Sequence, residues 1–341
     1  MSDTTLNATE SGMLADIRLH DIVVGVDGSD ESFAALRWAL NEASLTGQQV
    51  NAVFAWSHSW DMGSEPEDEE QWAEVRHEIA QRLRDWVSKA SQGMTINEDH
   101  VKLTSVKATG TSALLEIGKD AQQIVVGRRS LGRVARWFLG SLSESLAEAA
   151  QVPVTIVRIL DDEESSVQDA IANALTPSEN TVTYDLPGSP LPKNQRPIVV
   201  GVDGSETSRH ALRFAIDLAA LHHAPLQVMF CWQLKDLGVI EGYENAIAPI
   251  AVGQERAERI LDELLDSVEI PTAGIPDDFQ IESHAFHISA AKGLIAASRY
   301  ARHLVVGSRG LSGLDAHFLG SVSKQIVNFA DCTVTVRSEE R

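Results

Sequence analysis

One stretch of this sequence occurs twice, and this internal repeat constrains the fold more than any other feature. Residues 21–43, DIVVGVDGSDESFAALRWALNEA, align without a gap with residues 197–219, PIVVGVDGSETSRHALRFAIDLA, and 14 of the 23 positions are identical. Residues 121–146 align in the same way with residues 301–326, with 11 of 26 positions identical. The sequence therefore predicts two copies of one domain.

The repeats divide the 341 residues into two domains and two further segments. We expect a flexible leader at residues 1–17, a first domain at 18–160, an acidic linker at 161–195 and a second domain at 196–341. The linker combines acidic residues with prolines, which is typical of an extended connection, and a short helix is expected within it at residues 167–175.

Strands and helices are expected to alternate within each copy. In the second copy, apolar runs of strand length lie at residues 197–203, 225–232, 279–286, 303–307 and 332–337. Segments with helical periodicity separate them, at residues 206–223, 251–268, 290–301 and 321–330, and Ser205 is a suitable N-cap for the first of these helices. This alternation predicts an α/β fold: two tandem, doubly wound, Rossmann-like domains, each with a five-stranded parallel sheet flanked by helices.

The composition excludes some classes of partner. Acidic residues outnumber basic ones by 49 to 28, giving a net charge of −21, whereas nucleic acids and anionic membranes are bound by concentrated Lys and Arg. The polar start of the chain does not resemble a signal peptide, and no apolar run approaches the roughly 18 residues of a membrane span. We therefore expect a cytoplasmic protein, with Cys231 and Cys332 as buried free thiols.

Three glycines and a serine lie at fixed spacing late in the second copy. Gly307 ends a predicted strand, Gly310 follows it, and Gly320 with Ser321 opens a predicted helix. A helix N-terminus offers unpaired N–H groups and a partial positive charge, and glycine allows a phosphate to approach the backbone. Glycines at such places also serve ordinary turns and caps. The recurrence of the nine-residue gap in both copies, beside a strand that ends in Asp-Gly-Ser, favours a phosphate site.

Several common sites are excluded by their missing motifs. The sequence has no GxxxxGK[ST], and the first strand of each copy runs into GVDGS, not GxGxxG. A P-loop NTPase and a dinucleotide-dependent dehydrogenase are therefore disfavoured. The spacing of the histidines suggests neither a metal site nor a catalytic triad, so no catalytic and no metal-binding residue is expected. Trp56 and Trp232, in register at the ends of equivalent strands, are expected to pack in the core.

The spacing G-x2-G-x9-G-[ST] resembles the nucleotide signature of the universal stress protein family. The second copy fits it at Gly307, Gly310, Gly320 and Ser321, and VVGVDGS and CTVTVR are also similar to that family. The resemblance covers both repeats. It implies a tandem member whose halves pair like a dimer of single-domain proteins, with the last strands, VTIVR and VTVR, meeting between them.

The resemblance also implies a nucleotide site in each half. Asp203 would lie at the ribose and phosphates, and Cys231 would present its backbone to the adenine. The implied contacts of the second site are Gly201, Val202, Asp203, Cys231, Val306, Gly307, Gly310, Gly320, Ser321, Val322 and Ser323. Those of the first site are Gly25, Val26, Asp27, Ala55, Val126, Gly127, Ser130, Gly140, Ser141, Leu142 and Ser143.

The first copy departs from the motif at one position, where Ser130 aligns with Gly310. A serine there is costly if the backbone is left-handed, and its Cβ would crowd a phosphate. Arg128 or Arg129 offers a compensating phosphate donor. We expect both sites to accept a nucleotide, and the second to do so more reliably.

The resulting prediction is a cytoplasmic, ATP-binding stress protein. ATP, alone or with Mg²⁺, would act as a signal or structural ligand in a stress response, and AMP and cyclic nucleotides stay open as ligands. No residue is an obvious base, so any hydrolysis of ATP is expected to be slow. The alternatives are a nucleotide-dependent enzyme, such as a slow ATPase or a transferase, and a nucleotide-free interaction scaffold. A homodimer of the whole chain also stays open, and no protein partner is predicted.

Overall fold

A computed structural model describes residues 20–56, 68–128, 141–159, 196–270, 275–276, 279–310 and 319–338. The expected linker helix at residues 167–175 lies outside them. The first half contains β1 (Ile22–Gly25), α2 (Asp30–Thr46), β2 (Val50–Trp56), α3 (Glu69–Ala90), η2 (Glu98–His100), β3 (Val101–Lys107), α4 (Gly110–Ile117), β4 (Gln123–Gly127), α5 (Ser141–Ala149) and β5 (Val154–Val157). The second half contains β6 (Ile198–Val202), α7 (Glu206–Leu221), β7 (Leu226–Cys231), η5 (Leu234–Asp236), α8 (Ile250–Asp266), β8 (Ile281–Phe286), α9 (Ala290–Ala297), β9 (His303–Gly307), α10 (Ser321–Phe329) and β10 (Thr333–Arg337).

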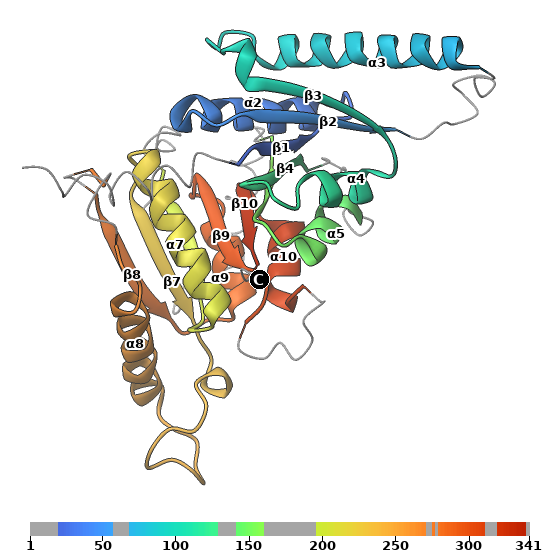
Figure 1. Ribbon diagram of the computed structural model, residues 1–341. Coiled ribbons are helices and arrows are strands. Elements are labelled where there is room, and N and C mark those ends of the chain that lie inside the picture. The colour runs from blue at the N-terminus through green and yellow to red at the C-terminus, as the bar shows by residue number, and fades with distance from the viewer. Residues whose placement is uncertain are drawn as a thin grey trace, which may run out of the picture.

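The strands of the described ranges form one ten-stranded sheet, in the order β3-β2-β1-β4-β5-β10-β9-β6-β7-β8 (Figure 1). Neighbouring strands within each half are parallel. β5 and β10 pair antiparallel where the halves meet. The prediction of two doubly wound α/β domains is confirmed, and so is the expectation that the last strands of the two copies meet.

Local sequence explains how the first helix of each half begins. Ser29 and Ser205 are the N-caps of α2 and α7, and each hydroxyl accepts a hydrogen bond from the backbone N–H three residues later. Gly28 and Gly204 precede these serines with φ of 87° and 86°, a left-handed conformation that glycine adopts without steric cost. The repeated Asp-Gly-Ser therefore turns the chain from strand to helix, and the prediction of Ser205 as an N-cap is confirmed.

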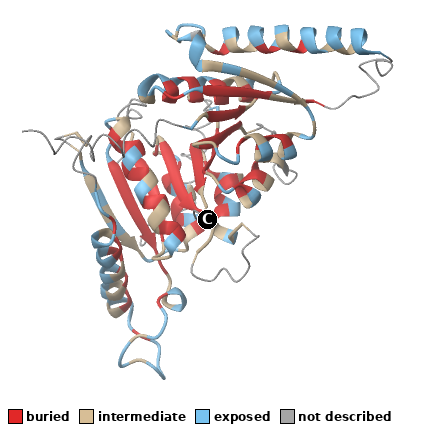
Figure 2. Ribbon diagram, viewed as in Figure 1, coloured by how far each residue is buried: buried red, intermediate tan, exposed pale blue. Residues whose placement is uncertain are grey.

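Three hydrophobic clusters cover the two faces of the sheet. Alternate residues of a strand point to opposite faces, so Ile198 and Val200 enter a cluster with α7 and α8, whereas Val199 enters a different cluster. The cluster under α2 and α3 belongs to the first half alone. The third cluster contains Leu146 of α5 and Ile326 of α10, so both halves contribute to it. Figure 2 shows the central strands as the buried layer of the molecule.

A line of buried hydrogen bonds crosses the seam between the halves. Thr155 of β5 and Thr335 of β10 are paired in the antiparallel register, with 2.7 Å between their Oγ1 atoms. Thr155 donates to Gln123 Oε1 at 2.7 Å, so Thr335 donates to Thr155. The His303 Nε2–H then donates to Thr335 Oγ1, also at 2.7 Å. The polar groups in the centre of the sheet are thus satisfied across the seam.

A second polar contact joins α2 to the end of α7. His222 Nε2 and Glu42 Oε1 are 2.6 Å apart, with both side chains almost fully buried. Arg302 donates to His222 Nδ1 at 2.8 Å. Because a guanidinium only donates, Nδ1 accepts, and the Nε2–H donates to Glu42. In the aligned positions, Leu218 corresponds to Glu42 and Thr46 to His222, so this contact has no counterpart on the other side of the seam.

None of the helices in the described ranges combines the length and apolarity that crossing a membrane requires.

The buried imidazole of His303 makes folding sensitive to acid. Burial, together with the nearby His222 and Arg302, lowers the pKa of His303 from 6.5 to about 3. Between these two pH values the unfolded chain binds a proton that the folded chain does not, so this residue lowers the free energy of unfolding as the pH falls from about 6.5 to about 3. The effect between pH 7 and pH 5 should be about 2 kcal/mol.

The variant His303→Gln tests this effect, because glutamine occupies the aligned position 123. Urea denaturation at pH 7 and pH 5 should show a smaller loss of stability on acidification for this variant than for the native chain. Substitution of the exposed His100 by glutamine is the matched control and should keep the native dependence. Equal pH dependence in H303Q and the native chain would contradict the assignment.

Candidate functional site

The candidate site of the second half lies at the carboxyl ends of β6 and β9. These two strands are neighbours, with Gly201 beside Val306, at the point where the strand order of this half reverses. Such a switch point in an open α/β sheet is the usual place of a ligand crevice. Asp203 follows β6, and Gly307 ends β9. The sequence prediction that these two residues face one crevice agrees with this arrangement.

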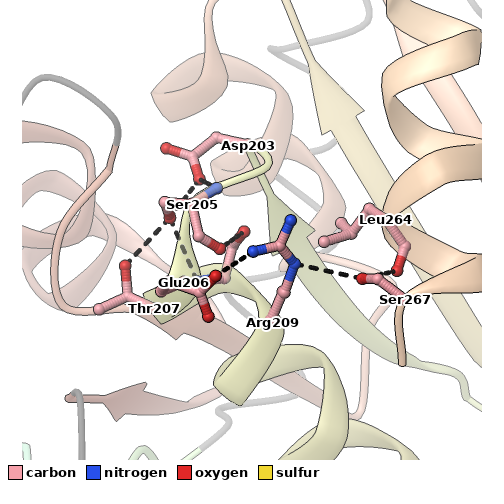
Figure 3. Close-up of polar contacts among 8 residues, drawn as sticks. Asp203, Ser205, Glu206, Thr207, Arg209, Leu264 and Ser267 are labelled. Atoms are coloured by element: carbon pink, nitrogen blue, oxygen red, sulfur yellow. Dashed lines mark hydrogen bonds and ion pairs between the residues drawn. The ribbon is translucent and has the colours of Figure 1, made fainter. Parts of the chain in front are cut away.

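The carboxylate of Asp203 is held in place by the turn that follows it. Ser205 donates to Asp203 Oδ1 from its backbone N–H at 3.0 Å and from its hydroxyl at 2.6 Å (Figure 3). The other carboxylate oxygen lies against Gly310, where a Cβ would stand 2.3 Å from Oδ2. Asp203 and Gly310 are therefore in direct contact, although 106 residues separate them in the sequence.

This contact corrects one expectation about Gly310. The backbone of Gly310 is not left-handed, because its φ is not among the positive values of the described glycines. A side chain here would collide with the Asp203 carboxylate, so that carboxylate, which Ser205 holds through Oδ1, would have to shift. The second half therefore offers contact with the neighbouring aspartate, and not a left-handed backbone, as a reason why serine at the aligned position 130 would be unfavourable, and crowding of a phosphate stays a prediction.

Three hydrogen bonds fix the loop between Gly307 and Gly310. The Thr207 hydroxyl donates to the Arg309 carbonyl at 2.8 Å, which ties the loop to the first turn of α7. The Gly320 N–H donates to the Ser308 carbonyl at 2.8 Å. The Ser323 hydroxyl donates to the Gly307 carbonyl at 2.6 Å. The end of β9 and the beginning of α10 are thus bound to each other.

The glycines of the motif meet in this loop. A Cβ on Gly307 would stand 3.1 Å from Thr207 Cβ and 3.2 Å from the Arg309 carbonyl oxygen. A Cβ on Gly320 would stand 3.2 Å from the Ser308 carbonyl oxygen. The structure therefore brings Asp203 and the three motif glycines together around one short loop.

The N-terminus of α10 has no side-chain cap. Its N-cap residue is Gly320, and no side chain bonds to the first turn there. In α7, by contrast, the Ser205 hydroxyl accepts from the Ser208 N–H at 3.2 Å. An uncapped helix N-terminus presents N–H groups and the positive end of the helix dipole to a ligand. Ser321, Val322 and Ser323 form this first turn, as the sequence predicted.

Other implied contacts of the second site lie at the same edge of the sheet. Val202 ends β6, and Cys231 ends β7. The Cys231 Sγ points toward α9, where a Cβ on Gly293 would approach it to 2.6 Å, so only the backbone of Cys231 is left to face the crevice. Burial raises the pKa of both Cys231 and Cys332 to about 12, and both thiols are free and buried, as predicted.

The equivalent place in the first half is described only in part. Gly25, Val26, Asp27, Ala55, Val126 and Gly127 lie at or beside the carboxyl ends of β1, β2 and β4. Asp27 Oδ1 accepts from the Ser29 N–H at 3.0 Å, so the aspartate turn is preserved. Ser141, Leu142 and Ser143 begin α5. Ser130 and Gly140 lie outside the described residues.

Arg128 does not have the role that the sequence suggested. It was expected as a donor to a phosphate in the first site. Its guanidinium instead donates to the carbonyls of Ala330, at 2.7 Å, and Asn328, at the end of α10 in the other half. Arg129 lies outside the described residues.

Across the described ranges, no group of three or more His, Cys, Asp or Glu side chains is placed to hold a metal ion.

The two tryptophans at the ends of equivalent strands lie in the core, as predicted. Trp232 is fully buried and donates to Gln254 at 3.1 Å, and Trp56 is 9% exposed.

Thr207 and the Arg309 carbonyl support the loop, a role that the sequence alone does not predict. Thr207 aligns with Glu31, so comparison of the two copies gave no sign of a shared function. In the first half the Glu31 carbonyl oxygen occupies the equivalent space and would stand 2.2 Å from a Cβ on Gly127. Both halves thus require a glycine at the end of this strand, for different local reasons.

The fold defines a tandem α/β protein whose candidate site lies at the carboxyl ends of its strands. The family model described as "Universal stress protein family" matches residues 19–158 and 195–337. The chain belongs to the universal stress protein family.

Individual relatives extend over nearly the whole chain. A universal stress protein of Mycolicibacterium smegmatis is 29% identical over 324 residues, which cover 93% of this chain and 96% of that protein. One of Mycobacterium tuberculosis strain H37Rv is 28% identical over 321 residues, with the same coverage of each chain. The crystal structure of a universal stress protein from Archaeoglobus fulgidus is similar with a TM-score of 0.58 and 16% identity, covering 95% of this chain and 97% of that one, which supports the fold alone.

The contact between Gly310 and Asp203 can be tested by a double-mutant cycle. Gly310→Ala should lower the free energy of unfolding by about 1–3 kcal/mol, because the added Cβ collides with a carboxylate that Ser205 holds in place. The same substitution should cost less in an Asp203→Ala background, where the collision is absent.

Gly110→Ala is the control for this cycle, since a Cβ there would meet only Leu142 at an ordinary 3.5 Å. Chemical denaturation of the four chains of the cycle gives the coupling energy. A coupling energy of zero would show that the two residues do not contact each other.

Proposed function

We propose that the chain is a cytoplasmic universal stress protein that binds ATP in the second half, between the ends of β6 and β9. The observation that carries the proposal is the convergence of Asp203, Gly310 and the uncapped start of α10 on one loop. Glycines keep this loop free of side chains, and the helix start supplies donors for an anion.

Each group has a distinct role in this proposal. The N–H groups at the start of α10, with the Ser321 hydroxyl, would hold the phosphates. The Asp203 carboxylate would accept hydrogen bonds from ribose hydroxyls, the use that an acidic residue has in other doubly wound nucleotide sites. Gly307, Gly310 and Gly320 would admit the nucleotide close to the backbone. The backbone at Cys231 would lie at the base, and Mg²⁺ would accompany the phosphates if the metal binds.

The described groups agree best with a nucleotide that is bound but not hydrolysed. Neither thiol forms a thiolate at neutral pH, because burial raises the pKa of each to about 12. The Asp203 carboxylate is occupied by Ser205 through one of its oxygens. We therefore propose that ATP acts as a signal or structural ligand in the stress response, with hydrolysis at most slow. AMP and cyclic nucleotides present the same adenosine and phosphate groups and stay open as ligands.

The same proposal includes the domain bounds 18–160 and 196–341, with residues 161–195 as the linker. The matched regions of the family model, residues 19–158 and 195–337, support these bounds. The first half would hold a second nucleotide less reliably, because Ser130 replaces the glycine that faces the aspartate.

The test is direct measurement of bound nucleotide. Mass spectrometry of the nucleotide released on denaturation, and calorimetric titration of the stripped protein, should show ATP bound by the native chain. Asp203→Ala should weaken ATP affinity at the second site by about 10- to 100-fold, because the substitution removes the charged acceptor of the hydrogen bonds that the ribose hydroxyls donate.

Asp27→Ala is the matched control, because Asp27 makes the same turn in the first half. It should leave the second site unchanged. No bound ATP, no shift in Tm with millimolar ATP, or equal affinities in the native chain and D203A would contradict the proposal.

A further inference from the structure

The helix α10 extends from the proposed phosphate site to the seam between the halves. It begins at Ser321, where the phosphates would bind, and ends at Phe329. Nine helical residues rise by about 13 Å, so the two ends of one short rigid element lie in different functional surroundings. The inference below rests on the proposed nucleotide site, and it concerns what holds this helix in place.

The carbonyl end of α10 is bound by two arginines of the first half. Arg128 donates to the carbonyls of Ala330, at 2.7 Å, and Asn328. Arg158 donates to the Ala330 carbonyl at 2.7 Å and to Asp331 Oδ1 at 2.6 Å. The last carbonyls of a helix have no partner within the helix, so these guanidinium groups satisfy them. Their charge is also favourable at the negative end of the helix dipole.

A third side chain of the first half holds the other end of the helix. Glu144 of α5 forms an ion pair with Lys324, one turn after the start of α10. Glu144 and Lys324 occupy the same aligned position in the two copies of the repeat. Because the two residues carry opposite charges, their contact favours the pairing of the first half with the second half. Together with the arginines, this contact fixes α10 at both ends from outside its own domain.

The two arginine contacts are not repeated by the residues at the aligned positions of the second half. Arg128 and Arg158 align with Ser308 and Ser338 in the second half. In the described structure, the hydroxyls of both serines are buried and have no hydrogen-bond partner. These serines therefore do not donate to the end of α5 as the arginines donate to the end of α10. The aligned residues of the two halves thus differ at this contact.

We propose that Arg128 and Arg158 are positioning residues for the nucleotide site of the second half. They contact no nucleotide. They hold α10 so that the N–H groups of its first turn face the loop between Gly307 and Gly310. The first half thereby contributes to nucleotide binding in the second half, independently of whether it binds a nucleotide itself.

The test compares ATP with adenosine, which lacks the phosphates that α10 would hold. All variants carry Asp27→Ala, so that the second site is measured alone. In this background Arg128→Ser, which introduces the residue of the aligned position 308, should weaken ATP binding by about five- to tenfold in calorimetric titration. Adenosine affinity should stay within about twofold, because α10 does not hold the base or ribose.

Two further variants separate positioning from general stability. Arg84→Ser removes an exposed arginine of the same half, on α3, and should leave both affinities unchanged. Arg128→Lys retains the charge but not the paired donors, and should give an intermediate ATP affinity. If Arg128→Ser fails to fold, Arg128→Lys provides the comparison, with a selective loss of ATP affinity as the expected result.

Three outcomes would overturn the inference. They are ATP affinity unchanged by Arg128→Ser, an equal loss of ATP and adenosine affinity, and an equal effect of Arg84→Ser. An unchanged ATP affinity contradicts only the positioning role and leaves the nucleotide site intact. Absence of ATP binding in the native chain contradicts the proposed function, and the positioning role with it.

Discussion

The antiparallel pairing of β5 with β10 is the contact on which the rest of the structure depends. Every other strand pair lies within one half and is parallel, so this pair alone turns two five-stranded sheets into one. It places Thr155 opposite Thr335 and buries their hydroxyls, which would be costly without partners. The chain of donors from His303 to Gln123 supplies those partners, and the shared hydrophobic cluster of both halves forms around it.

The two halves of this pseudo-symmetric molecule are not chemically equivalent. Where the repeat aligns Glu144 with Lys324, the two residues meet as opposite charges. A hydrogen-bonded chain on one side of the seam consists of Glu42, His222 and Arg302. The aligned positions carry Leu218, Thr46 and Gln122 instead. Identical halves would place like charges together at the Glu144–Lys324 contact, because these two residues occupy the same aligned position. A fused chain can distribute complementary groups between its copies, and this one has done so both at the partly exposed Glu144–Lys324 pair and at the buried Glu42–His222 contact.

The sequence predicted the fold well because the determining signals are local and repeated. Apolar runs located the strands, Ser205 marked a helix start, and comparison of the copies separated the motif glycines from incidental ones. The nine elements expected in the second copy agree with β6–β10 and α7–α10, apart from differences of a few residues at their ends. Helix and strand ends are the least determined by sequence, since capping and fraying compete there.

The contacts that define the site were not predictable in the same way. The close approach at Gly310 is to a carboxylate 107 residues earlier, and no local pattern records it. Arg128 lies inside a phosphate-binding motif in sequence, yet its partners are main-chain carbonyls 200 and 202 residues away. Thr207 differs from its aligned residue, so the repeat gave no indication of its hydrogen bond to the loop. Side-chain direction and tertiary partners decide such roles.

The direction of β5 has a consequence for the connection between the halves. Because β5 runs opposite to β10, β9 and β6, the end of β5 and the start of β6 lie on the same side of the sheet, three strand spacings or about 15 Å apart. About five extended residues would bridge that distance, whereas residues 158–197 supply 40. The connection is therefore much longer than this distance requires. It acts through the high local concentration that it gives each half around the other, and its length is free to vary without altering how they meet.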